Sequence, residues 1–335
     1  MNWLDLYRNA LESPEAAAGY YNRNVGVPTL DGRVNVRIPL PAADTMDVRV
    51  WREEDVLACI RPYVGQAPEL RHVSHDPRFQ VHHFIEGRVL DSFSPRGSSV
   101  PGHVLGDVVA VMDQLARIPQ EKAPALPAHW PASGDSAGFG CLLADLTRQV
   151  HATYEDEYAA VFAELGIPER PLAVVDARWA ELASRPFAVL HADLHRKNMI
   201  VAGGVTWFLD WELALWGDPM YEIAIHFHKM DYPDDQRAEV LRRWCERLPA
   251  AATAGPVSDL DLYLAHERLK SAIVDTVRYS KQLAAAAPPE REFLIGRLAK
   301  KLNAAHRVWG EAPDMTPERV ARALAPWLER RTWMP

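Results

Sequence analysis

The most constraining feature of the sequence is a short segment in which polar residues alternate with apolar runs. His191, Asp193 and Asn198 form a His-x-Asp-x-x-x-x-Asn pattern, and an apolar run follows it directly. A Gly-Gly pair then leads into a second apolar run, which ends on Asp210. Two short apolar runs joined by a glycine turn predict a β-hairpin. We therefore expect Asp193, Asn198 and Asp210 at neighbouring ends of one small platform.

These three side chains suit phosphoryl transfer. A carboxylate can orient an attacking hydroxyl and accept its proton, while an amide oxygen and a second carboxylate can hold Mg²⁺ at the phosphates. The pattern therefore predicts Asp193 as the catalytic base and Asn198 and Asp210 as metal ligands. We expect His191 to orient the loop from the core rather than to carry a proton.

The segment resembles the aminoglycoside phosphotransferase and choline kinase family, a group of small-molecule kinases related distantly to protein kinases. The residues from His191 to Asn198 are similar to its catalytic loop, and Asp210-Trp-Glu212 is similar to its metal-binding motif. Residues 217–224 resemble its Gly-Asp-Pro-x-x-Asp-Leu-Ala motif. The resemblance implies transfer from ATP, with Mg²⁺, to a hydroxyl, and it leaves the acceptor open.

The resemblance also implies an α+β fold of the two-lobed protein-kinase-like type, with a small antiparallel β N-terminal lobe and a larger, mostly helical C-terminal lobe. Alternation and turn signals predict four strands early in the chain, at 24–28, 34–39, 70–73 and 79–85. Helical spacing predominates later. We expect lobes at 1–85 and 86–335, with a hinge at about 82–87.

The first two strands and their turn, Leu30-Asp31-Gly32, predict a unit whose backbone N–H groups could cover ATP phosphates. Asn22 and Asn24 precede this turn, and their Asn-Arg-Asn triplet resembles one in the nucleotide loop of the family. The resemblance therefore implies Asn22 and Asn24 as nucleotide-binding residues. An ordinary surface hairpin fits the same pattern equally well.

Kinases place a lysine on the next strand, where it grips the nucleotide phosphates and pairs with a helix glutamate. No lysine occurs before Lys122, so the resemblance implies Arg37 in this role, with Arg49 as a weaker rival. A guanidinium can hold phosphate and carboxylate in a bidentate manner, although a solvated strand arginine is the alternative. Of the two acids that begin the following helix, the resemblance favours Glu53 over Glu54 as the partner.

The end of the fourth strand resembles the hinge of the family. The resemblance implies that adenine bonds to main-chain groups, best placed at His83 and Ile85. The adjacent His82 and His83 point to opposite faces of a strand, so we do not expect them to share a metal ion.

Charge and composition bound the partners. A net charge of −8 and a pI of about 5.9 argue against nucleic acid or an anionic membrane as a partner and suit a cationic substrate, although acidity also aids solubility. Three widely spaced cysteines without a CxxC pair fit reduced thiols. The N-terminus lacks a leader pattern, and 18 apolar residues nowhere run together. We expect a cytoplasmic monomer or homodimer that acts on a small molecule with a hydroxyl acceptor.

The region after Asp210 is acidic, which could provide a rim for an aminated sugar, although such a run is usually a solvated face. Its members are Glu212, Asp218, Glu222, Asp231, Asp234 and Asp235. Our first expectation is an antibiotic-inactivating phosphotransferase, hence a resistance enzyme, for an aminoglycoside-like or other sugar- or nucleoside-containing antibiotic. The second is a metabolic kinase for a sugar, choline-like or amino-alcohol substrate.

Two hypotheses from other classes use the same residues. His191, Asp193 and His195 could be ligands of a zinc-dependent hydrolase, but Asn198 would then have no role. A catalytically silent nucleotide-binding module is the other hypothesis, and the presence of the complete set of base and metal ligands argues against it.

Overall fold

The computed structural model describes the chain except residues 1, 15–16, 19–21, 41–45, 47–48 and 333–335. Its residues divide into two compact units, each assembled from separate stretches. The first unit contains Met1–Ala128, Phe187–Glu222 and Lys229–Thr253, and the second contains His129–Pro186, Ile223–His228 and Ala254–Pro335. The predicted boundary between residues 85 and 86 falls inside the first unit. The division into lobes at that boundary therefore stays a prediction.

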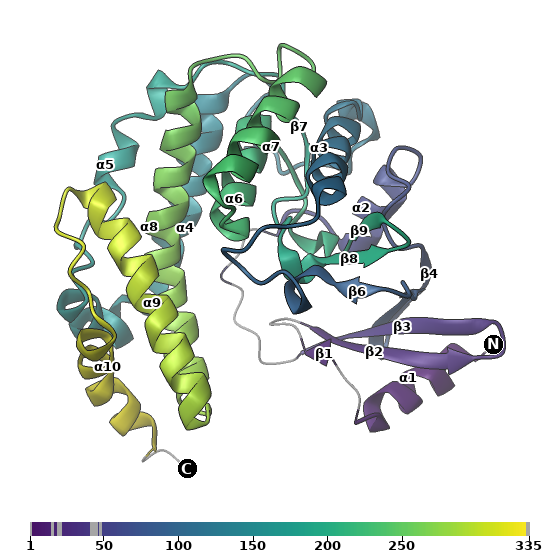
Figure 1. Ribbon diagram of the computed structural model, residues 1–335, viewed down its shortest axis with the longest axis horizontal. Helices are drawn as coiled ribbons and strands as arrows, with labels where there is room; N and C mark the ends of the chain where they lie inside the picture. The colour runs from purple at the N-terminus through teal and green to yellow at the C-terminus, as the bar shows by residue number, and fades with distance from the viewer. Residues whose placement is uncertain (1, 15–16, 19–21, 41–45, 47–48, 333–335) are drawn as a thin grey trace. The chain divides into compact units, whose positions relative to one another are not determined.

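A five-stranded antiparallel sheet forms near the start of the first unit, in the order β1-β2-β3-β5-β4. Its strands are β1 (Ala17–Ala18), β2 (Asn22–Thr29), β3 (Gly32–Pro39), β4 (Leu70–His75) and β5 (Arg78–His83). Figure 1 labels four of these strands, β1, β2, β3 and β4. The four strands expected from alternation are all present. Helix α1 (Trp3–Glu12) packs its buried Leu6 and Ala10 against the apolar face of this sheet.

The turn between β2 and β3 lies far from the end of this hairpin that carries Arg37. Thr29 pairs with Gly32 beside the turn, whereas Asn24 pairs with Arg37. Arg37 lies five positions after Gly32, which corresponds to about 16 Å along a strand. The expected cover over phosphates at Arg37 therefore cannot come from the turn Leu30-Asp31-Gly32. Residues 19–21, between β1 and β2, lie outside the described residues.

The remainder of the first unit supports the catalytic segment. The predicted hairpin is present as β8 (Met199–Ala202) and β9 (Val205–Phe208), and β6 (Arg88–Val89) pairs with β8. Gly203 and Gly204 both have positive φ, which the tight turn requires. A second antiparallel pair joins β7 (Ala188–Leu190) to β10 (Leu215–Gly217). The helical segments of this unit are α2 (Glu53–Ile60), η1 (Leu90–Ser92), α3 (Gly102–Ala116), η2 (Gln120–Lys122), η4 (Arg196–Asn198), η5 (Trp211–Leu213) and α7 (Asp234–Arg247).

The second unit is helical. It contains α4 (Ser136–Glu164), α5 (Ala173–Asp176), η3 (Trp179–Glu181), α8 (Val257–Leu283), α9 (Pro288–Trp309) and α10 (Pro317–Thr332). Helices α8 and α9 lie side by side (Figure 1). Proline in the first turn of α9 and Gly310 in a left-handed conformation after it are typical start and stop signals. The middle of α6 (Pro219–Met230) also belongs to this unit, while its ends belong to the first.

The small antiparallel sheet and the many helices confirm the predicted α+β class. Within the described part of the chain, none of the helices combines the length and apolar character that crossing a membrane requires.

Candidate active site

The loop that we predict to be catalytic begins directly after β7, at His191. This side chain is fully buried, its Nε2 lies 3.1 Å from the carbonyl oxygen of Leu209, and its ring centroid lies 4.3 Å from that of Trp211. Burial lowers the pKa of His191 to about 4, which keeps the imidazole neutral. These contacts fit the orienting role expected for His191.

The chain turns sharply at the next residue. Ala192 has a φ of 57°, in the left-handed region, and its backbone N–H donates to Oε2 of Glu222 at 2.9 Å. Burial raises the pKa of Glu222 to about 7. A buried carboxyl group from α6 therefore holds the turn that leads into Asp193.

Asp193 is held at both of its carboxylate oxygens. Oδ2 accepts a hydrogen bond from Nδ2 of Asn198 at 2.8 Å, and Oδ1 forms an ion pair with the Lys229 ammonium. His195 Nε2 lies 3.6 Å from Oδ2. Burial alone would raise the pKa of Asp193, but Lys229 and His195 hold it well below its usual range. The side chain is therefore an ionised and well-fixed carboxylate.

Asn198 connects the loop to the segment that carries Asp210. Its Nδ2 also donates to the main-chain oxygen of Asp193 at 3.1 Å. The main-chain oxygen of Asn198 accepts from the N–H of Leu209 at 2.8 Å. Because the amide nitrogen is used inside the loop, Oδ1 is the atom that would ligate a cation. Asp210 follows with a left-handed φ of 65°. Hydrogen bonds therefore link Asp193 to Asn198 and Asn198 to Leu209, the residue directly before Asp210.

Arg37 lies at the centre of a buried acidic cluster. Its NH2 lies 2.6 Å from Asp210 Oδ1 and 2.9 Å from Glu212 Oε2, and its NH1 lies 3.4 Å from Glu53 Oε1. Burial alone would lower the pKa of Arg37, but the three carboxylates raise it. The expected pairing with Glu53 is present, whereas Glu54 forms an ion pair with Arg52. Arg37 is therefore not a solvated strand residue.

Glu53 and Glu212 extend this cluster to neighbouring elements. Glu53 accepts the backbone N–H of Trp211 at 3.0 Å, and burial raises its pKa to about 7. Glu212 Oε1 lies 3.0 Å from NH2 of Arg49, so Arg49 joins the cluster at its edge instead of replacing Arg37. Burial also raises the pKa of Glu212.

The structure places the two predicted nucleotide-loop asparagines differently. Asn22 Nδ2 donates to Glu212 Oε2 at 3.0 Å, so this side chain belongs to the acidic cluster. The Asn24 side chain instead accepts from Asn35 Nδ2 at 3.2 Å, within the β2–β3 hairpin. Their role in nucleotide binding stays a prediction.

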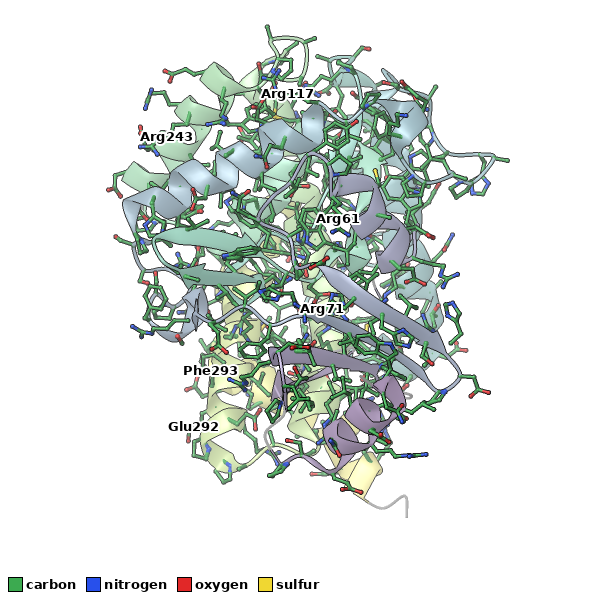
Figure 2. The ribbon with its side chains drawn as sticks, turned by 90° about the vertical axis from the view of Figure 1, so that its right-hand side faces the viewer. Arg61, Arg71, Arg117, Arg243, Glu292 and Phe293 are labelled. Atoms are coloured by element: carbon green, nitrogen blue, oxygen red, sulfur yellow. The ribbon has the colours of Figure 1, made fainter. Side chains whose placement is uncertain are left out.

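The two predicted hinge residues have specific main-chain and packing contacts. The N–H of His83 donates to the carbonyl of Glu69 at 2.8 Å, so a nucleotide contact at His83 would need another atom. His83 lines a cavity of about 480 Å³, to which Arg61 and Arg71 also contribute. Figure 2 labels these two arginines. Ile85 is buried, and its contact with adenine stays a prediction.

Only part of the acidic rim expected after Asp210 is exposed, namely Asp231, Asp234 and Asp235, and its role in binding a substrate stays a prediction. Asp218 and Glu222 are buried, and Glu212 is paired with two arginines. Asp231 lies 3.4 Å from the guanidinium Nε of Arg96. The charges of Asp218, Glu222 and Glu212 are therefore buried or paired inside the protein, although the sequence alone would place them at the surface.

Sequence reasoning missed Lys229 and the structural role of Glu222. Glu222 occupies the acidic position of the Gly-Asp-Pro motif, so this motif could have identified it. Lys229 lies 36 residues after Asp193 and belongs to no spacing pattern. Only the fold brings it to the base.

The donor set of the site fits magnesium. Amide and carboxylate oxygens, as in Asn198 and Asp210, are the ligands that Mg²⁺ prefers, and one or two of them suffice when substrate phosphates supply others. Among the residues that the structure describes, no group of three or more His, Cys, Asp and Glu side chains could hold a metal. The zinc hypothesis is not supported, because His191 is enclosed and bonded to the main chain.

Comparison with known proteins agrees with this geometry. The sequence model of the phosphotransferase enzyme family (APH) matches residues 14–256, well over half of the chain. The chain belongs to this family. The membership confirms the predicted class of enzyme, a phosphotransferase with a hydroxyl acceptor. No curated protein sequence matches the chain.

Solved kinase structures share the fold of this phosphotransferase. A choline/ethanolamine kinase family protein from Mesorhizobium loti aligns with a TM-score of 0.57 and 16% identity, over 97% of this chain and 98% of that chain. A thermostable mutant of aminoglycoside phosphotransferase APH(4)-Ia, in its apo form, aligns with a TM-score of 0.56 and 16% identity, over 91% and 97%. A ternary complex of that enzyme with ADP and hygromycin B gives a TM-score of 0.52 and 16% identity, over 90% and 97%. These likenesses confirm the protein-kinase-like fold.

Proposed function

We propose that this phosphotransferase transfers the γ-phosphate of ATP to a hydroxyl of a small molecule in a magnesium-dependent reaction. The observation that carries the proposal is the hydrogen-bonded path from Asp193 through Asn198 to the segment of Asp210. It supports one base and two oxygen ligands acting on the same phosphate group. The ADP complex of the structurally similar APH(4)-Ia further supports a nucleotide donor.

Each side chain has a defined task in this proposal. Asp193 accepts a hydrogen bond from the acceptor hydroxyl and takes its proton as the oxygen–phosphorus bond forms and ADP leaves. Asn198 and Asp210 would hold Mg²⁺, which supplies neutralisation of phosphate charge when bound. Arg37 keeps Asp210 and Glu53 in place, and we propose that its guanidinium group also binds the ATP phosphates.

An antibiotic remains our first choice of acceptor, with a metabolic small molecule second. Both choices are supported at the level of fold, since similar structures include an aminoglycoside phosphotransferase with hygromycin B and a choline/ethanolamine kinase family protein. The proposed use of ATP is consistent with the expected location in the cytoplasm, which stays a prediction. Whether the protein is a monomer or a homodimer stays a prediction.

The test is a screen for acceptor-dependent ATP consumption, with and without Mg²⁺. The acceptors are aminoglycosides, nucleoside antibiotics, macrolides, sugars and simple alcohols, with Asp193→Asn as the blank. We expect ADP and a phosphorylated acceptor only when ATP, Mg²⁺ and wild-type enzyme are combined. Transfer that proceeds equally well with Asp193→Asn would contradict the assignment of the base.

A further inference from the structure

The catalytic base already has a cationic partner within the protein. Lys229, near the C-terminal end of α6, forms an ion pair with Oδ1 of Asp193, while Asn198 holds Oδ2. The Asp193 side chain is 13% exposed and that of Lys229 is 25% exposed, so solvent screens the pair only in part. All three residues belong to the same compact unit.

This ion pair changes the charge that an acceptor meets at the base. A carboxylate without a cation would attract an ammonium group beside the reacting hydroxyl. At about 5 Å and an effective dielectric constant of about 20, that attraction corresponds to roughly a hundredfold in affinity. Lys229 cancels most of this attraction, because its own ammonium repels a second one at similar range.

Glu222 and Glu212, two acids of the same unit, do not restore the attraction. Glu222 is buried and bonded to the backbone of Ala192, and Glu212 is paired with Arg37 and Arg49. His195 also faces Asp193, at 3.6 Å. The described groups that contact the base therefore bring N–H donors and positive charge to it.

A neutral hydroxyl can still reach the base with Lys229 in place. Each carboxylate oxygen has more than one lone-pair direction, so Asp193 can accept an O–H in addition to its present donors. An acceptor without an adjacent amine would therefore bind without displacing the ammonium.

We propose that the acceptor is a compound whose reacting hydroxyl has no neighbouring ammonium group, such as a neutral sugar or the ribose of a nucleoside. The inference rests on the proposed function and narrows its substrate class. It separates this protein from a kinase for amino alcohols or for a hydroxyl next to an amine in an aminated sugar.

Matched acceptors test the proposal. The pairs are glucose with glucosamine, glycerol with serinol, and any acceptor from the screen with its aminated or deaminated analogue. We expect wild-type kcat/KM to favour the non-aminated member of each reactive pair at least tenfold. Lys229→Met should reduce this preference about tenfold or more, and Lys229→Arg should retain it.

A second buried lysine–aspartate pair provides the control. Lys301 Nζ lies 2.6 Å from Asp275 Oδ2 in the second unit, where the Asp275 side chain is 10% exposed and that of Lys301 is 13% exposed. Lys301→Met should lower stability, because the buried Asp275 carboxylate then loses its shorter ion pair and keeps the longer contact with Arg278, at 3.7 Å, and should not change the preference. A wild-type preference for aminated members, or an unchanged preference in Lys229→Met, would overturn the proposal.

Failure of the proposed function is distinguishable from failure of this inference. If no acceptor is phosphorylated, the transfer assignment fails, and the charge preference is read from binding in the presence of ADP and Mg²⁺. The increase in Tm should then be larger for non-aminated members, and this difference should shrink in Lys229→Met. Equal or larger stabilisation by amines, or none by any compound, would overturn the inference.

Discussion

The backbone N–H of Ala192 donates to Oε2 of Glu222 at 2.9 Å, at the residue where the catalytic loop adopts a left-handed conformation. In the left-handed region, a residue other than glycine lowers stability by about 1 kcal/mol, because its Cβ crowds the backbone. Such a conformation persists where the surrounding structure holds it in place. Glu222 lies on α6, so a helix beyond the hairpin fixes the turn between His191 and Asp193. The geometry of the base therefore depends on a residue that need not touch either substrate.

This relationship predicts a pH dependence of stability. Burial raises the pKa of Glu222 to about 7, above the ordinary glutamate value of 4.5. Between these values the folded protein keeps a proton that the unfolded chain releases, so stability falls as pH rises from about 4.5 through about 7. The expected loss from Glu222 is on the order of 2–3 kcal/mol.

The substitution Glu222→Gln should remove this loss while retaining an acceptor for the Ala192 N–H. Urea unfolding at about pH 5 and about pH 8 measures it. The wild type should lose more stability between the two conditions than Glu222→Gln, whereas exposed Glu121→Gln should behave as the wild type. Glu53 has a pKa raised in the same direction and leaves part of the slope in every variant. Identical slopes for wild type and Glu222→Gln would refute the assignment.

Local spacing was sufficient to predict the catalytic hairpin and the residues on it. The glycine turn, the apolar runs and the polar residues at their ends all lie within about one supersecondary unit, where sequence distance determines spatial distance. Arg37 and Glu53 were identified through the family resemblance, which places a basic residue on a strand and an acid on the helix that follows it. In the structure, Arg37 forms ion pairs with both Glu53 and Asp210.

The sequence alone does not show which charged side chains the fold buries or pairs, or which residues face each other across the β2–β3 hairpin. Asp218 and Glu222 looked like surface acids, because a sequence does not show which face of a segment packs against other elements. Lys229 reaches Asp193 only through the packing of α6. The turn at 30–32 resembled a phosphate cover until the strand register placed it at the opposite end of the hairpin from Arg37.

We expect Asp193→Asn to reduce kcat by about 10²- to 10⁴-fold, because an amide cannot accept the proton of the acceptor hydroxyl. The KM for ATP should change little, since Asn198 and Asp210 are retained. Steady-state kinetics with a confirmed acceptor measures both values. Nucleotide binding by the variant is the control for folding, and near wild-type kcat would rule out Asp193 as the base.

Arg37→Met should destabilise the protein strongly, since it leaves three carboxylates without their shared cation. Breaking a buried ion-pair cluster in this way costs about 3–5 kcal/mol. Urea unfolding measures the change. Arg49→Met is the matched control, because Arg49 also pairs with Glu212 but is 33% exposed, so its loss should cost about 1 kcal/mol or less. Similar losses in the two variants would show that Arg37 is not the centre of the cluster.

The left-handed conformation of Ala192 predicts an unusual response to glycine. Ala192 and Ala10 are both buried alanines, but Ala10 lies in helix α1 and Ala192 has a φ of 57°. Glycine costs about 1 kcal/mol in a helix relative to alanine, whereas it relieves about 1 kcal/mol in the left-handed region. Since each variant loses one buried methyl group, Ala10→Gly should be less stable than Ala192→Gly by about 1–2 kcal/mol. Thermal and urea unfolding measure the difference, and equal losses would mean that the turn at Ala192 is not strained.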